Sequence, residues 1–558
     1  MAAAGGAALP YHEPDIVTIL ILVSFILLLN LTDYIFDKIL YCGLLAQLFL
    51  GIGWGTPGAN WVGREFEHVA VNLGYLGLLL IVYEGGLMTS FKALKENILL
   101  SIGVAITGIA LPISASYILL PLVGATPLQA FAAGAALCST SLGTTFTVMK
   151  ASGLITTKMG IVLTSAAMLD DVVGLVMVQV ISNLGASSAS FSAITVVRPV
   201  CVSIGFVGAV PLAAYFIIRP FTIWLNRKRT TTPTSYINRV LTWQATALLI
   251  HTAILVGLIA ATSYAGTSNL FAAYLAGASI SWWDTTLEHP TSHAPSGDDS
   301  TNHGGRSPSV SCAPSSTSGL EIFEHFFLQP LQRILKPLFF ASIGFSVPIS
   351  RMFTGGVIWR GFVYSIFMFV SKFTCGFWLM RLPGLASSVL KSMRRSNTEK
   401  KPPGGNNIGT GAAVAAGSSV VSDAQRPSSD AVPVPKSSVI AEKKQSTRQQ
   451  SNQGRPRTRP TVTSTSKPIS LYPGCIVGCA MVARGEIGFL ISALAESNGI
   501  FGNEPDGPMF LVVTWAIMIC TIIGPLIVGA LVARVKKMES RAAGGPGRKD
   551  VLGEWGVS

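Results

Sequence analysis

Residues 165–180 read SAAMLDDVVGLVMVQV and place two adjacent carboxylates, Asp170 and Asp171, inside an apolar run. A charged side chain at the centre of a membrane costs about 2.5–3.5 kcal/mol on insertion scales, so an acid in such a run indicates a functional site. Two neighbouring acids repel each other, and burial disfavours their charged forms. We therefore predict that this pair exchanges a proton for a cation near ambient pH. The alternative is a pair neutralised by a buried base, with no role in transport.

The whole chain has the composition of a membrane protein. Of its 558 residues, 50% are hydrophobic and only 12% are charged, whereas about 25% are charged in soluble domains. Apolar runs of about 18 residues or more predict membrane-spanning helices, because backbone amides in hydrocarbon must bond within their own segment. The predicted fold class is an all-α polytopic membrane protein with about 13 transmembrane helices. The expected spans are 15–32, 36–56, 68–89, 98–123, 127–149, 158–183, 197–225, 240–264, 268–283, 330–350, 356–380, 471–494 and 507–534.

Loop charges predict how these spans cross the membrane. Basic residues gather in alternate loops, as at Lys92 and Lys95 and again at 227–229, which by the positive-inside rule places the N-terminus outside and the C-terminus in the cytosol. The loop 381–470 carries 15 Lys and Arg against 4 Asp and Glu, a net +11 of the chain's +13. Its composition predicts disorder, and its charge favours anionic membrane lipids over nucleic acid as partner.

The domain organisation follows from these spans and loops. We expect an extracytoplasmic tail at 1–14, membrane segments at 15–283, 320–380 and 471–535, a disordered loop at 284–319, the basic cytosolic loop at 381–470 and a cytosolic tail at 536–558.

A run of hydroxyl side chains precedes the acid pair by one span. Residues 136–148 read ALCSTSLGTTFTV and include Ser139, Thr140 and Ser141. Such a run weakens a helix and offers the oxygen ligands that a dehydrated hard cation requires. The alternative is a helix interface, where small residues permit close packing.

Two further charge clusters lie within apolar runs. Residues 479–494 read CAMVARGEIGFLISAL, in which Arg484 and Glu486 bracket Gly485. A second interrupted helix predicts inverted repeats around a midplane site, and the alternative is a local Arg–Glu pair. Lys372 lies well inside the run 358–380 and requires a counter-charge, for which Asp170 and Asp171 are the candidates. The alternative is that Lys372 snorkels to the interface.

At these residues the chain resembles the sodium/hydrogen exchanger superfamily, specifically the second monovalent cation:proton antiporter branch with NapA-type members. The resemblance covers about residues 15–535. It rests on MLDDVVGL (168–175), the hydroxyl run, KPLFFASIGFSV (336–347) and ARGEIGFLISAL (483–494), in that order. The basic loop favours a eukaryotic, fungal-like member. That loop is longer than is usual in the family, and the nucleotide-binding tail of the potassium-efflux members is absent.

The resemblance implies a core domain with two crossed, broken helices, a separate dimerisation domain and a homodimer. It implies that Asp171 is the main ion- and proton-binding carboxylate, with Asp170 paired to Lys372. Thr140 and Ser141 fall in the first crossed helix, and Arg484 and Glu486 compensate charge in the second. The implied function is antiport of Na⁺, K⁺ or Li⁺ against H⁺ by elevator-type alternating access, with no cofactor.

Two other transport classes stay open at this point. A facilitative cation channel would ignore a pH gradient, and an organic-ion symporter on a related fold would favour an arginine at the substrate over twin acids. An enzyme is disfavoured, because no nucleophile–base pair or metal-ligand set is present. The sequence leaves undecided the preferred cation, the stoichiometry, the regulation, the choice between plasma and internal membranes, and the roles of loop 381–470 and of His289, His293 and His303.

Overall fold

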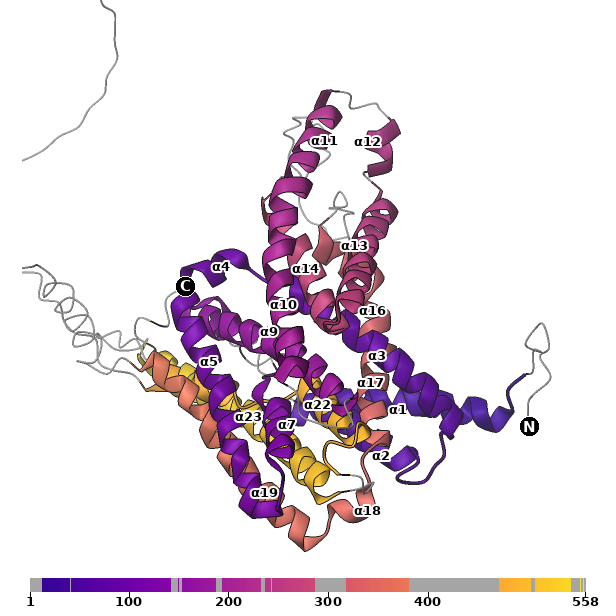
Figure 1. Cartoon of the computed structure of the whole chain (residues 1–558), viewed down its shortest axis with the longest axis vertical. Coiled ribbons are helices and arrows are strands. Elements are labelled where there is room, and N and C mark those ends of the chain that lie inside the picture. The colour runs from indigo at the N-terminus through magenta and orange to yellow at the C-terminus, as the bar shows by residue number, and fades with distance from the viewer. Residues whose placement is uncertain are drawn as a thin grey trace, which may run out of the picture. The chain divides into compact units, whose positions relative to one another are not determined.

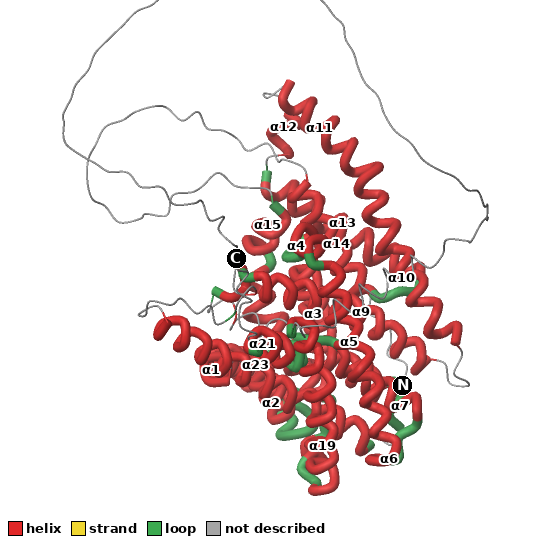
Figure 2. Tube along the Cα trace, turned by 90° about the vertical axis from the view of Figure 1, so that its left-hand side faces the viewer, coloured by secondary structure: helices red, strands yellow, loops and turns green. Residues whose placement is uncertain are grey.

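The computed structural model describes residues 13–40, 42–141, 149, 153–186, 193–231, 236–241, 243–286, 318–380, 471–502, 507–542, 552 and 555. The chain divides into two units, Met1–Arg381 with Pro468–Ser558, and Leu382–Lys467. The second unit lies outside the described residues, as do the predicted loop 381–470 and most of the predicted loop 284–319. All regular elements of the described residues are helices, as Figure 2 shows.

Helices follow one another along the described chain, and Figure 1 gives their arrangement. They are α1 (Ile16–Leu40), α2 (Gly43–Trp54), α3 (Arg64–Leu87), α4 (Phe91–Glu96), α5 (Ile98–Ala115), η1 (Ser116–Ile118), α6 (Leu119–Val123), α7 (Pro127–Cys138), η2 (Leu154–Thr156), α9 (Lys158–Ala186), α10 (Ala193–Ala213), η3 (Ala214–Ile218), α11 (Arg219–Thr231), α12 (Tyr236–Leu241), α13 (Gln244–Ala265), α14 (Asn269–Thr286), α15 (Gly319–Phe326), α16 (Leu328–Pro330), η4 (Leu331–Leu335), α17 (Lys336–Phe345), α18 (Ile349–Met352), α19 (Gly355–Phe373), η5 (Thr374–Leu379), α21 (Tyr472–Ala480), α22 (Glu486–Ser497) and α23 (Pro508–Ala542).

Every one of the thirteen predicted spans contains helix. Within the described residues, eight helical stretches are long and apolar enough to cross a membrane. The other five ranges contain short or interrupted helices, among them α2, α7 and the pair α21 and α22. The all-helical, multi-pass fold class is therefore confirmed, and the protein is an integral membrane protein.

The boundary between the first two predicted spans was wrong. We expected a loop between residues 32 and 36, but α1 continues without a break to Leu40 and α2 begins at Gly43. Residues 32–40 contain neither Gly nor Pro, so nothing in them stops a helix. The acids Asp33 and Asp37 are consequently carried on the helix itself.

Two helices are interrupted inside the membrane-length runs. Thr126 and Gln129 form a capping box at the start of α7, but the helix ends at Cys138, where Ser139 turns to an extended backbone with ψ 148°. α7 therefore ends before the predicted span does, and residues 142–148 of that span lie outside the described residues. In the second interruption α21 ends at Ala480 and α22 begins at Glu486, as the glycine between Arg484 and Glu486 predicted.

The described helices pack in two groups. The scaffold group contains α1, α2, α3, α13, α14 and α17, and the site group contains α5, α7, α9, α19, α21, α22 and α23. The two groups meet where α9 contacts α14, where α22 contacts α17 and where α1 contacts α23.

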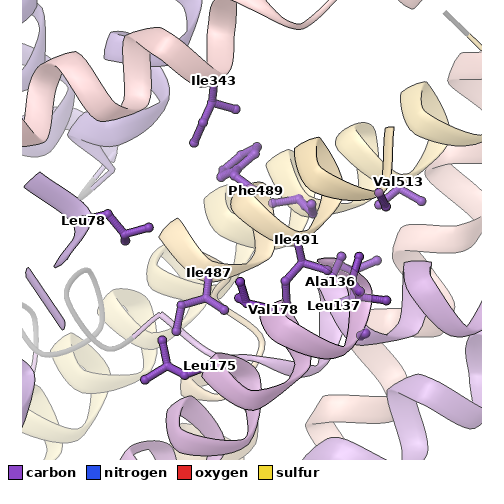
Figure 3. Close-up of a cluster of buried hydrophobic side chains, with 14 of the residues drawn as sticks. Leu78, Ala136, Leu137, Leu175, Val178, Ile343, Ile487, Phe489, Ile491 and Val513 are labelled. Atoms are coloured by element: carbon purple, nitrogen blue, oxygen red, sulfur yellow. The ribbon is translucent and has the colours of Figure 1, made fainter. Parts of the chain in front are cut away.

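An apolar layer fills part of this boundary. Figure 3 shows Ile487 and Phe489 of α22 and Leu175 of α9 facing Leu78 of α3 and Ile343 of α17. All five side chains belong to one buried cluster. The side chains of this layer are apolar, so they contact one another without hydrogen bonds of their own.

Candidate functional site

The two interrupted helices cross at their breaks. The backbone N–H of Ser141 donates to the carbonyl of Ala483 over 2.9 Å. A Cβ on Gly485 would lie 2.5 Å from both Cβ and Oγ of Ser141, so the chains approach closely only because position 485 has no side chain. The hydrogen bond satisfies backbone groups that an unwound segment would otherwise leave unpaired in hydrocarbon.

Half-helix ends of opposite polarity meet at this crossing. The carboxyl end of α7 carries a partial negative charge, and the amino end of α22 carries a partial positive charge. Arg484, which is fully buried, donates from Nη1 to the carbonyl of Ser139 over 2.7 Å, just beyond the end of α7. Glu486 lies in the first turn of α22. Arg484 therefore contacts the carboxyl end of α7 and Glu486 lies at the amino end of α22, although the two are only two residues apart.

Asp170 forms a buried ion pair. Lys372 of α19 donates from Nζ to Oδ2 of Asp170 over 2.6 Å, and both side chains are fully inaccessible to solvent. Thr140 joins the pair, because its hydroxyl donates to Oδ2 of Asp170 over 2.5 Å and accepts from Nζ of Lys372 over 2.9 Å. The Thr140 hydroxyl also lies 3.3 Å from the carbonyl of Met481 in the second break. The ion pair thus connects α9, α19 and both breaks.

Asp171 has a different environment although it is the next residue. Its Oδ1 accepts a hydrogen bond from the hydroxyl of Ser139 over 3.3 Å, and its side chain is only partly buried. Glu486 begins α22, which packs against α9, the helix that carries Asp171. A site with carboxylate and hydroxyl oxygens and a net negative charge suits a hard monovalent cation or a proton.

The adjacent acids therefore have separate tasks available to them. Asp170 is held at Oδ2 by an ammonium group and a hydroxyl, whereas Asp171 accepts one hydroxyl hydrogen bond and is only partly buried. Because the two carboxylates are consecutive on α9, a charge bound at Asp171 changes the field at the Asp170–Lys372 pair.

All seven predicted site residues lie at or beside this crossing. Thr140 contacts Asp170, whereas Ser141 uses its backbone amide in the crossing. Sequence reasoning did not assign Ser139 to Asp171, and it did not find the carbonyls of Met481 and Ala483. The hydroxyl run was the signal for Ser139, but it does not tell which hydroxyl faces which acid.

Comparison with known proteins places these features in a family. Residues 21–434 match the family model described as "Sodium/hydrogen exchanger, transmembrane". The chain is 30% identical over 144 residues to the high-affinity Na⁺/H⁺ antiporter NhaS3 of Synechocystis sp., covering 25% of this chain and 31% of that protein. It is 28% identical over 129 residues to the Na⁺/H⁺-K⁺ antiporter GerN of Bacillus cereus, covering 23% of this chain and 33% of that protein. These matches span about a third of the curated relatives' length.

A solved structure is similar over nearly the whole chain. It is the sodium proton antiporter MjNhaP1 from Methanocaldococcus jannaschii, with 12% identity and a TM-score of 0.46, and the match covers 93% of this chain and 98% of that one.

Proposed function

The chain belongs to the sodium/hydrogen exchanger family, and we propose that it exchanges a monovalent cation for protons across a membrane through Asp171. The observation that carries the proposal is the difference between the two adjacent acids. Asp170 is held in a buried ion pair with Lys372, whereas Asp171 accepts one hydrogen bond from the Ser139 hydroxyl and is only partly buried.

Exchange follows from competition at one carboxylate. A deprotonated Asp171 binds a cation, with the Ser139 hydroxyl as a neighbouring oxygen group, and a protonated Asp171 does not. Na⁺ is the first substrate to test, and K⁺ and Li⁺ follow, because one relative carries Na⁺ and K⁺ in its name.

The number of protons exchanged per cation depends on whether Lys372 loses its own proton during transport. If the arrival of a cation or proton releases Lys372 from Asp170 and Lys372 then loses its proton, two protons move per cation and exchange is electrogenic. If Lys372 keeps its charge throughout, one proton moves per cation and exchange is electroneutral. A current measurement under exchange conditions distinguishes the two cases.

We further propose elevator-type alternating access. The site group would move against the scaffold group, and the apolar layer between Phe489, Ile343 and Leu78 supports this, because its side chains contact one another without hydrogen bonds of their own. In this proposal the scaffold group forms a homodimer and the chain belongs to the NapA-type branch.

The test is cation-induced proton movement in proteoliposomes that contain the purified protein. We expect Na⁺ or another alkali cation to collapse an imposed pH gradient with wild type and not with Asp171→Asn. Asp37→Asn on α1 is the matched control, since it removes an exposed acid from the scaffold group and should retain exchange.

Three other outcomes count against the proposal. Cation flux that ignores the pH gradient would indicate a channel. Proton movement driven only by organic ions would indicate a symporter. Full exchange by Asp171→Asn would remove the assigned carboxylate from the mechanism.

A further inference from the structure

One position beside Asp171 on α9 lacks a side chain and contacts residues at both helix breaks. Gly174 follows Asp171 by three residues on α9, so the two lie on the same face of the helix. A Cβ on Gly174 would lie 3.0 Å from Cβ and 3.2 Å from Oγ of Ser139, and 3.2 Å from Cγ2 of Ile487. Ser139 follows the end of α7, and Ile487 lies in the first turn of α22. At Gly174, therefore, α9 meets both broken helices.

Ser139 is held in place by two hydrogen bonds. Its carbonyl accepts from Nη1 of Arg484 over 2.7 Å, and its hydroxyl donates to Oδ1 of Asp171 over 3.3 Å. The residue is buried, and its neighbour Thr140 is bound to Asp170. Because its backbone and its neighbour are both held, Ser139 has little freedom to follow the carboxylate if it is pushed away from α9.

The hydrogen bond between Ser139 and Asp171 tolerates little displacement. Its oxygen atoms are 3.3 Å apart, and at about 3.6 Å no hydrogen bond remains, so roughly 0.3 Å can be lost. Carbon atoms pack at about 3.5–4.0 Å, so a methyl group on Gly174 would push the Cβ of Ser139 away from α9 by roughly 0.5 Å. The displacement exceeds what the hydrogen bond tolerates, and the hydroxyl would lose the carboxylate.

We propose that Gly174 is a positioning residue of the cation site, whose missing side chain lets the hydroxyl of Ser139 reach Asp171. A glycine inside a helix destabilises it relative to alanine, and this role gives a reason for the glycine in the motif MLDDVVGL. The inference rests on the proposed antiport function and adds to it a residue that does not touch the cation. Because Gly174 acts through Ser139, a side chain at position 174 should weaken cation binding in the same way as loss of the Ser139 hydroxyl.

The experiment measures the apparent KM for Na⁺ and the maximal rate of antiport in proteoliposomes. For Gly174→Ala we expect KM to rise roughly three- to tenfold, the effect of one lost hydrogen bond, with the maximal rate within about twofold of wild type. Ser139→Ala should have the same effect. Gly103→Ala is the matched control, because its Cβ would meet the ring of Trp378 at 3.0 Å, an equally close contact with a side chain outside the site. Its KM should stay within about twofold of wild type.

A double variant tests whether Gly174 acts through Ser139. Ser139→Gly removes both atoms of Ser139 that the new methyl group would meet. Ser139→Gly/Gly174→Ala should therefore have the KM of Ser139→Gly alone, within about twofold, since the two changes remove the same interaction. This comparison also decides the question if Gly174→Ala by itself does not fold.

The outcomes separate this inference from the proposed function. An unchanged KM for Gly174→Ala or for Ser139→Ala, with Asp171→Asn inactive, overturns the role of Gly174 alone. A KM that is higher for Ser139→Gly/Gly174→Ala than for Ser139→Gly also overturns it, because the methyl group then acts by a route other than Ser139. If wild type shows no cation–proton exchange, or Asp171→Asn retains it, the proposed function fails first.

Discussion

Gly485 is the position where one added methyl group should disrupt the crossing of the two broken helices. Its φ of −149° lies outside the left-handed region, so the close contact at the Cβ position is the effect of Gly485→Ala that we develop here. The new Cβ would lie 2.5 Å from Cβ and Oγ of Ser141, and the next atom, Cα of Ser141, is 3.4 Å away. Carbon atoms pack at about 3.5–4.0 Å, so the chains must separate by roughly 1 Å.

This separation has a cost that can be estimated. Overpacking of this kind costs about 1–3 kcal/mol, which corresponds to a melting temperature lowered by roughly 2–10 °C. The same displacement would stretch the 2.9 Å bond from Ser141 to Ala483. Because Thr140 is next in the chain to Ser141, the site moves as well, and we expect antiport to fall by at least about tenfold.

A second substitution tests the stated cause. Ser141→Gly removes both atoms at 2.5 Å and leaves Cα at 3.4 Å, an ordinary contact. The double variant Ser141→Gly/Gly485→Ala should therefore recover most of the melting temperature and of the antiport rate in proteoliposomes. A Gly485→Ala variant that melts and transports like wild type, or a double variant that shows no recovery, would contradict this explanation.

Three further predictions concern the charged groups. Lys372→Met should lower the free energy of unfolding by about 3–5 kcal/mol, because it leaves Asp170 buried without its charged partner. Adding Asp170→Asn to the same chain should restore most of that loss in a thermal unfolding assay. Equal stability of the single and double variants would contradict this. Arg484→Gln should lower stability by about 1–3 kcal/mol, since the carbonyl of Ser139 loses its charged donor, and a melting curve identical to wild type would show that the contact is dispensable. The apparent KM for Na⁺ should rise as the pH falls, by up to about tenfold per pH unit, because a protonated Asp171 is neutral and cannot hold the cation. The maximal rate should stay constant. A KM that does not change with pH would exclude direct competition between Na⁺ and the proton.

Much of the fold could be predicted from the sequence because hydrocarbon imposes a simple constraint. Apolar runs of membrane length must be helical, so all thirteen predicted ranges contain helix. The interruption beside Gly485 and the weakness of the hydroxyl run were also visible as local features. The end of α1 was not, because residues 32–40 lack any breaker and the expected loop rested on hydropathy alone.

Charges in apolar runs are too costly to be there by accident, so the candidate residues at mid-membrane can be identified from the amino-acid sequence alone. Their partners become visible only in the folded arrangement of the helices. Lys372 is 202 positions from Asp170 and 232 from Thr140 along the chain, yet all three meet in one ion pair. The neighbouring residues in the sequence do not distinguish the role of Asp170 from that of Asp171. They also do not show that Arg484 contacts the carboxyl end of α7 instead of pairing with Glu486. Those assignments depend on which helix faces which, and that is set by the close packing of glycine and alanine faces and by backbone groups that must find partners where two helices break.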